Sequence, residues 1–351
     1  MSIFDRYVGG IILRSVATVL FVVLALDTMN ELLGQMSRIE GNYTFGAALS
    51  YVVLQIPGSA VGYLGFAALI GCLIGVGGLS NSSELTVIRA AGVSTLQIVG
   101  MVLKPTLVII VLGMLVSEFI APNLEQVAQS RRDFLRGNSA LQQEHGTWLR
   151  DGSDYLHVNA VYPGGELFGV SRFQFVDRKL TSLSFAESVQ FQNGVWNEWV
   201  VTETRFLPTT TETQSLSNRV WDTELTPDIL DMASLSPEHL SLRGLYSYSR
   251  YLGLETRFAS NYRLAFWTKI FNPLAIAALV LVGLSFVYGA SRSVSIGQRI
   301  FVGIMVAVVF QQVQDILGPA SIIWGFSPII AVLTPIVITL AIGTFLLRRQ
   351  K

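Results

Sequence analysis

The chain has 351 residues, of which 51% are hydrophobic and only 14% are charged, and its net charge is zero. Soluble domains carry about 25% charged residues, so this composition excludes an ordinary soluble protein. It also excludes intrinsic disorder, which requires low hydrophobicity. The net charge of zero argues against a nucleic-acid-binding protein, which would carry a basic face. Residues 123–268 hold 30 of the 48 charged side chains and all three histidines. The sequence therefore predicts a polytopic membrane protein with one sizeable polar domain.

Six apolar stretches are long enough to cross a bilayer, which takes about 20 residues per helix. Gly318-Pro319 is a turn signal and separates the last two. We expect three spans, a polar insert and three more spans, so that the domains are 1–122, 123–265 and 266–351. The predicted spans cover about residues 11–34, 52–78, 97–121, 266–289, 297–318 and 325–347.

Basic residues collect on one side of these predicted spans, and basic loops remain in the cytoplasm. If both chain ends are cytoplasmic, nine basic residues lie on the inner side, and Arg38 alone lies in the short outer loops. The polar domain then lies outside the cytoplasm. The first apolar stretch is expected to be a retained helix, because Asp27–Asn30 follows it without a small-x-small cleavage site. The nine inner residues are Arg6, Arg14, Arg89, Lys104, Arg292, Arg299, Arg348, Arg349 and Lys351.

The inner loop between the second and third spans, residues 82–94, has the pattern of a short helix. Ser82 or Ser83 is a suitable N-cap, and Glu84 in the first turn is favoured by the helix dipole. Gly92 is suited to close the helix in a left-handed conformation. Apolar side chains between these ends predict an amphipathic helix with a stripe of Leu85, Val87 and Ile88.

Two interpretations of this helix remain open. It is either a coupling helix that fits a groove of a cytoplasmic ATPase, or a helix that lies passively in the headgroup plane. The residues expected to carry coupling are Ser83, Glu84, Leu85, Arg89 and Gly92.

The polar domain changes from a helical to an extended pattern after residue 146. Short runs rich in aromatic and β-branched residues alternate with turn signals, of which Asn193-Gly194 is typical of a two-residue hairpin. This regular spacing predicts a β-jelly-roll-like or sandwich domain. Residues 225–262 are expected to form a helical stalk that leads into the fourth span. The predicted strands are 148–149, 155–158, 167–175, 183–191, 195–204 and 215–221.

Signatures of enzymatic chemistry are absent from the sequence. It contains no Gly-Lys dipeptide, which a phosphate-binding loop requires, and no His-Glu-x-x-His or Gly-x-Ser-x-Gly motif. The lone Cys72 lies in an apolar run and cannot form an intramolecular disulfide. We therefore expect no enzymatic activity, no cofactor and no metal site.

Several segments together resemble the lipopolysaccharide export permeases of Gram-negative inner membranes, the LptF/LptG family. The similarity runs from end to end, and of the two paralogous branches the chain is more similar to LptG. The segments that carry it are Ser83–Gly92, Asp5–Gly9, Gly146–Gly152, Trp267–Pro273, Arg292–Val294 and Asp315–Pro319.

This resemblance implies a transport subunit that contributes to outer-membrane biogenesis. Its implied partners are an LptF paralogue in a heterodimer, a cytoplasmic dimer of the ATPase LptB, and the single-span protein LptC. Together they would extract lipopolysaccharide from the inner membrane and deliver it to a periplasmic bridge. Two alternatives are a mechanotransmitting subunit that conducts no substrate and a receptor with a ligand-binding β domain.

The outer half of the first span departs from the basic character that the family resemblance implies for lipid phosphates. Asp27 and Glu31 are four residues apart and share one helix face. They are expected to pair with basic side chains of a partner, or to share a divalent cation with the lipid, while Glu31 alone has the third option of being solvated. The candidate lipid-binding residues are Asp27, Glu31, Arg38, Arg263, Lys269 and Asp315.

Overall fold

The structure is a computed structural model that describes most of the chain. It divides into two compact units, a helical unit (residues 1–31, 56–122 and 241–351) and a sheet unit (residues 32–55 and 123–240). The described residues are 3–136, 147–151, 154–162, 166–177, 179–223, 225–252, 257–289 and 296–349.

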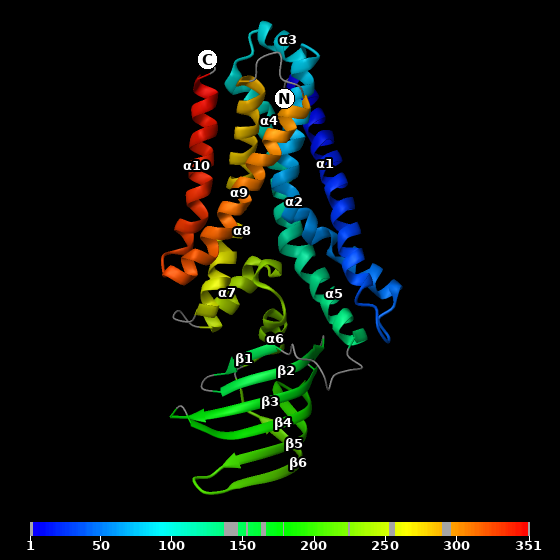
Figure 1. The fold of residues 1–351 in the computed structure, drawn as a ribbon, viewed down its shortest axis with the longest axis vertical. Helices are drawn as coiled ribbons and strands as arrows, with labels where there is room; N and C mark the ends of the chain where they lie inside the picture. Colours follow the sequence, from blue (N-terminus) through cyan, green and yellow to red (C-terminus); the bar gives the residue numbers. More distant parts are fainter. Residues whose placement is uncertain are drawn as a thin grey trace. The chain divides into compact units, whose positions relative to one another are not determined.

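Six helices are long and apolar enough to cross a membrane, which confirms the predicted 3+3 arrangement (Figure 1). The third span is composite, since an α-helix passes through a π-helical turn into a second α-helix. The spans are α1 (Ile3–Met36), α2 (Phe45–Asn81), the composite of α4 (Thr95–Leu115), η1 (Val116–Ile120) and α5 (Ala121–Arg136), α8 (Arg257–Gly289), α9 (Ile296–Trp324) and α10 (Pro328–Arg349).

The predicted break between the fifth and sixth spans was wrong. Helix α9 continues through Gly318 and Pro319 and ends only at Trp324. A proline inside a helix removes one hydrogen bond but does not force an end when the surroundings support the helix. The chain turns instead at Gly325, whose φ of +73° is left-handed, and Pro328 then begins α10.

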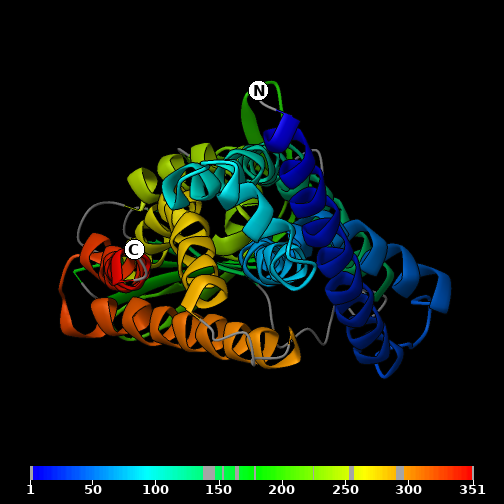
Figure 2. The ribbon, with the colours of Figure 1, turned by 90° about the horizontal axis from the view of Figure 1, so that it is seen from above.

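Small residues allow the helices of the helical unit to approach one another closely. A Cβ built on Gly71 of α2 would lie 2.6 Å from the Cα of Val16 in α1. On the other side of the bundle, a Cβ on Gly343 of α10 would lie 3.1 Å from Val282 of α8. Such contacts are typical of membrane helices, whose association depends on close packing. In both views α8 and the part of α2 that belongs to the helical unit lie between α1 and α10 (Figure 2).

The sheet unit contains the predicted β domain. Its strands form one antiparallel sheet in sequential order, so that consecutive strands pair as a meander. The hairpin at Asn193-Gly194 is confirmed, with φ values of 55° and 83°. The strands are β1 (Thr147–Asp151), β2 (Asp154–Tyr162), β3 (Glu166–Val176), β4 (Lys179–Gln192), β5 (Val195–Phe206) and β6 (Thr211–Trp221).

Short helices follow the last strand. Helix α6 (Pro227–Ser234) packs against β1 and β2, and Leu230 on it is fully buried. The indole N–H of Trp196 donates a 2.8 Å hydrogen bond to the carbonyl of Leu225, which ties β5 to the segment before this helix. A single 3₁₀ turn (Pro237–His239) and α7 (Leu242–Tyr251) follow in the segment 225–262 that was predicted as a helical stalk. Residues 253–256 of that segment lie outside the described residues, and 257–262 belong to α8.

Candidate functional site

The inner loop forms the predicted short helix, α3 (Glu84–Ala90). Leu85 and Ile88 are buried and belong to the core of the helical unit. Val87 is 66% exposed, so it does not share their stripe as predicted, because positions 85 and 88 share a helix face that position 87 does not. Arg89 is also exposed and lies in the last turn.

Both ends of α3 use left-handed backbone. Ser83 precedes the helix with a φ of 63° and its side chain makes no capping hydrogen bond, so the predicted side-chain cap is absent. Gly92 has a φ of +87°, as predicted, and its N–H donates a 3.0 Å bond to the carbonyl of Arg89.

The Glu84 carboxylate is held by two hydroxyl groups of the same chain. The hydroxyl of Tyr7 donates to one oxygen at 2.8 Å and that of Ser82 donates to the other at 2.9 Å. Tyr7 is on the first turns of α1, so this contact joins the start of the first span to the inner loop. Tyr7 was not predicted as a site residue, although it lies in the family-like Asp5–Gly9 segment.

An ion pair joins the start of α1 to the third span. The Lys104 ammonium lies 3.1 and 3.2 Å from the two Asp5 carboxylate oxygens. The Asp5 side chain is 10% exposed, whereas that of Lys104 is 58% exposed. Residues 5 and 104 are too far apart in sequence for periodicity to predict this pair.

The acidic residues of the first span have contacts within the chain. The Tyr63 hydroxyl of α2 donates a 2.8 Å hydrogen bond to the Asp27 carboxylate. Asp27 and Glu31 are both half-buried. Asp27 thus has a neutral donor in its own chain where the sequence predicted a cation.

The other candidate lipid-binding residues lie at separate places. Arg38 is exposed in the sheet unit, just after α1, and Arg263 donates to the Ser260 hydroxyl one turn away on α8. Asp315 is exposed on α9 and accepts a 2.9 Å bond from the Gln311 amide. Lys269 of α8 donates a 3.2 Å bond to the backbone carbonyl of Ser117 in η1. None of these contacts joins two of the six predicted residues.

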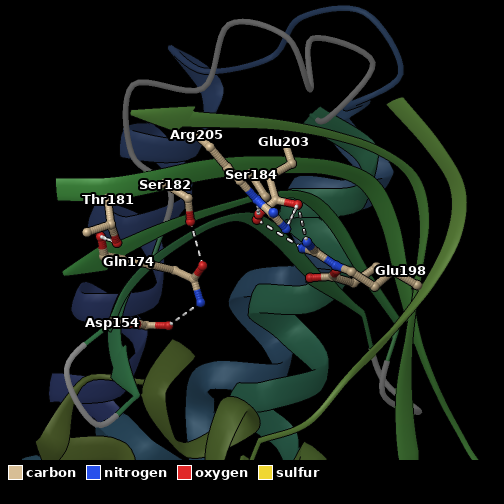
Figure 3. A network of polar contacts seen from close by, with 9 residues as sticks. Asp154, Gln174, Thr181, Ser182, Ser184, Glu198, Glu203 and Arg205 are labelled. Atoms are coloured by element: carbon tan, nitrogen blue, oxygen red, sulfur yellow. Dashed lines mark hydrogen bonds and ion pairs between the residues drawn. The ribbon is translucent and has the colours of Figure 1, made fainter. Parts of the chain in front are cut away.

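The sheet carries a buried charge network that the sequence did not predict (Figure 3). The Arg219 guanidinium of β6 donates to Glu198 at 2.6 Å, to Glu203 at 3.3 Å and to the Ser184 hydroxyl at 3.1 Å. The side chains of Glu198 and Glu203 are only 2% and 8% exposed. Arg205 also donates to Glu203, at 3.2 Å, but its own side chain is 65% exposed.

A backbone irregularity places both carboxylates on one face of β5. Residues 198 and 203 are five apart, so strict alternation would put them on opposite faces. Val200 between them has a left-handed φ of 53°, and buried positions change phase at this residue.

Arg172 of β3 lies at the edge of the same network. Its guanidinium carbon lies 5.8 Å from the centre of the Trp221 ring. Burial lowers the pKa of Arg172, while the nearby Glu198 carboxylate raises it.

Within the described part of the chain, no group of three or more His, Cys, Asp and Glu residues could hold a metal ion.

Comparison with known proteins places this architecture in one family. The model of the family "Lipopolysaccharide export system permease LptF/LptG" matches residues 6–349. The chain is 34% identical to the lipopolysaccharide export system permease protein LptG of Escherichia coli strain K12, over 100% of this chain and 99% of that protein. It is 32% identical to the LptG protein of Haemophilus influenzae, over 99% and 98% of the two chains. These matches confirm the predicted resemblance, and the chain belongs to the LptF/LptG family of lipopolysaccharide export system permeases.

Proposed function

We propose that this chain is the LptG-type permease subunit of an exporter that extracts lipopolysaccharide from the inner membrane and delivers it to a periplasmic bridge. The observation that carries this function is the end-to-end match to LptG relatives. Six membrane-capable helices and an inserted β domain support it. The protein is accordingly a transport subunit of the Gram-negative inner membrane, and ATP hydrolysis belongs to a separate cytoplasmic subunit.

The proposed partners are a paralogous LptF subunit, a dimeric LptB ATPase and the single-span LptC. Helix α3 supports coupling to the ATPase, because Leu85 and Ile88 anchor it to the bundle while Val87 and Arg89 stay exposed. A helix that is buried on one face and exposed on the other can move with a bound partner and remain attached to the spans.

Glu84 is the proposed electrostatic contact to the ATPase. A carboxylate offers about four lone-pair sites, and Tyr7 and Ser82 use one on each oxygen. A basic side chain of the ATPase can therefore bind Glu84 without displacing either hydroxyl. The two hydroxyls fix the carboxylate in one orientation, which lowers the entropy lost on binding.

The proposed lipid contacts are at the outer ends of the spans. Arg38 and Arg263 are suited to bind headgroup phosphates, since a guanidinium forms bidentate bonds to phosphate. Glu31 and the exposed Asp315 remain candidates for contacts to a partner or to a cation that bridges lipid phosphates. The hydrogen bond from Tyr63 favours a fixed, positioning role for Asp27.

Co-purification of the full-length chain from Gram-negative membranes, followed by identification of the retained lipid, tests this function. We expect LptF, LptB and LptC to accompany the chain together with lipopolysaccharide. A chain that purifies without an ATPase and retains only phospholipid would overturn the proposal.

The Glu84→Ala variant tests the coupling contact in the same assay. We expect loss of the ATPase from the complex, with about 2–5 kcal/mol of association energy removed if the pair is buried, while the chain still inserts. The matched control is the double variant Tyr7→Phe with Ser82→Ala, which removes both hydroxyl donors but keeps the carboxylate. If the control loses the ATPase as completely as Glu84→Ala, Glu84 acts only through the local structure of the loop.

A further inference from the structure

The third span changes its winding at η1 (Val116–Ile120), a π-helical turn, in which the pattern is a hydrogen bond from the N–H of one residue to the carbonyl five positions earlier. The N–H of Ala121 follows this pattern and donates to the carbonyl of Val116. The next carbonyl, that of Ser117, would require the N–H of residue 122. Residue 122 is a proline, which has no N–H.

Ser117 therefore lacks both of its ordinary backbone donors. The α-helical donor, Ala121, is committed to Val116, and the π-helical donor does not exist at Pro122. Ser117 is 8% exposed within an apolar span. A buried carbonyl without a donor is costly in such surroundings, so this position requires a donor from outside its own helix.

Lys269 of α8 supplies that donor. Its ammonium group lies 3.2 Å from the Ser117 carbonyl oxygen, and its side chain is half-buried. A charged donor makes a stronger hydrogen bond than a neutral one. The long side chain thus extends from the fourth span and satisfies a backbone carbonyl of the third span.

The next residue of the same turn holds a different helix. A carboxylate oxygen of Glu118 accepts a 2.8 Å hydrogen bond from the backbone N–H of Leu242, the first residue of α7. The hydroxyl of Ser241 accepts a second N–H, from Gly244, at 3.1 Å. The first N–H groups of a helix have no partners within it, and its dipole favours a negative charge at this end. Glu118 is therefore an N-terminal cap provided by a transmembrane helix.

A small cavity lies beside these contacts. Lys269 and Pro273 of α8 line it together with Gly113, Ser117 and Glu118 of the third span. Unfilled space next to a π-helical turn leaves room for the turn to change its winding.

We propose that Lys269 is a positioning residue that takes the place of the N–H missing at Pro122, and that with Glu118 it fastens the π-helical turn to α8 and α7. This turn would be the joint at which movement of the third span is passed to the two helices that follow the β domain in the chain. The inference rests on the proposed function. It gives Lys269 a role different from the lipid-phosphate contact that the sequence suggested.

A suppressor experiment separates the two roles. Lys269→Met removes the ammonium group, whereas Pro122→Ala restores a backbone N–H that can serve Ser117 in either winding, directly or by releasing Ala121. We expect Lys269→Met to lower lipopolysaccharide export in reconstituted vesicles by about tenfold or more, as loss of a buried charged hydrogen bond predicts. Adding Pro122→Ala should return export to within about threefold of that of the unchanged chain. If Lys269 binds lipid phosphate, the double variant stays as inactive as the single one, and the proposal is overturned.

The matched control is Pro105→Ala combined with Lys269→Met, because Pro105 is in the same span but outside the π-helical turn. It should give no rescue, and rescue by this control as well would overturn the assignment to Ser117. The thermal midpoint of the purified complex should fall in Lys269→Met, recover when Pro122→Ala is added, and stay low when Pro105→Ala is added. If the Lys269→Met chain does not accumulate in the membrane, the measurement becomes whether adding Pro122→Ala restores its accumulation. A double variant that also fails to accumulate contradicts the proposed role of Lys269. If the unchanged chain does not export lipopolysaccharide, the proposed function is contradicted. The thermal midpoints of the variants still test the contact between Lys269 and Ser117 in that case.

Discussion

Polar side chains are organised differently in the two units of this protein. In the helical unit the polar contacts are separate, and several of them tie one span to another, as Tyr63 does with Asp27 and Lys104 does with Asp5. In the sheet unit one guanidinium, that of Arg219, serves three acceptors on two neighbouring strands. The helical unit thus uses polar groups as single links, whereas the sheet unit combines them into a network.

This difference determines what a substitution should do. Removing a single, largely exposed link between helices, such as that of Lys104, leaves the apolar packing intact, so its effect on stability should be small. Removing the centre of a buried network leaves several charges without partners, and an unpaired buried charge is expensive. Replacing one cation by methionine should therefore destabilise the sheet unit more than the helical unit.

The largest expected effect is that of Arg219→Met. It leaves Glu198 and Glu203 buried without their shared cation, and we expect a loss of about 3–5 kcal/mol in the stability of the sheet unit. Limited proteolysis of the full-length chain over increasing urea concentrations measures this loss through cleavage within the strands. Arg205→Met is the control, because Arg205 binds the same Glu203 but is largely exposed, and it should cost less than about 1 kcal/mol. Equal effects of the two variants would contradict the network.

The order and type of the elements could be predicted from the sequence because burial repeats along each element. Apolar length gave the six spans, and the spacing of turn signals gave six strands, including the hairpin at Asn193-Gly194. The exception, at Gly318-Pro319, shows the limit of local signals. A proline indicates a helix end only when nothing else in the fold supports the helix, and a sequence does not reveal that support.

The site residues were harder to predict because their partners are distant in sequence. Glu84 could be proposed as a site residue from its isolation as a charge, but its contact with Tyr7 could not be predicted, since 77 residues separate them. The network around Arg219 depends on the left-handed backbone of Val200, a conformation that a valine gives no reason to expect. Lys269 was predicted as a lipid contact, whereas its acceptor in the structure is a backbone carbonyl, and no side-chain pattern reports a missing N–H.

An intermediate effect is expected at the end of α3. Gly92→Val introduces a β-branched side chain at a φ of +87°, although a Cβ there would meet no atom within 4 Å. The cost is therefore one of backbone strain, about 1–2 kcal/mol, and it should appear as weaker ATPase association without loss of the chain. Gly92→Asn should be milder, because asparagine tolerates left-handed backbone. Gly100→Ala also enters open space but at an ordinary helical position, and it should leave association unchanged. A defect in Gly100→Ala equal to that in Gly92→Val would show that lost glycine flexibility matters more than the sign of φ.

The smallest effect is expected at the link between Asp5 and Lys104. Lys104→Met removes a cation that is more than half exposed, and exposed ion pairs contribute about 0.2–1 kcal/mol. Asp5 also lies in the first turn of α1, where the helix dipole favours a carboxylate even without its lysine. Thermal unfolding of the purified full-length chain at low and high salt tests this difference between the units. At about 1 M salt the Debye length is near 3 Å, so the effect of Lys104→Met should vanish, whereas the buried network should keep the full effect of Arg219→Met. If salt abolished both effects, the charges around Arg219 would be as accessible to solvent as Lys104, and the contrast between single links and a buried network would be wrong.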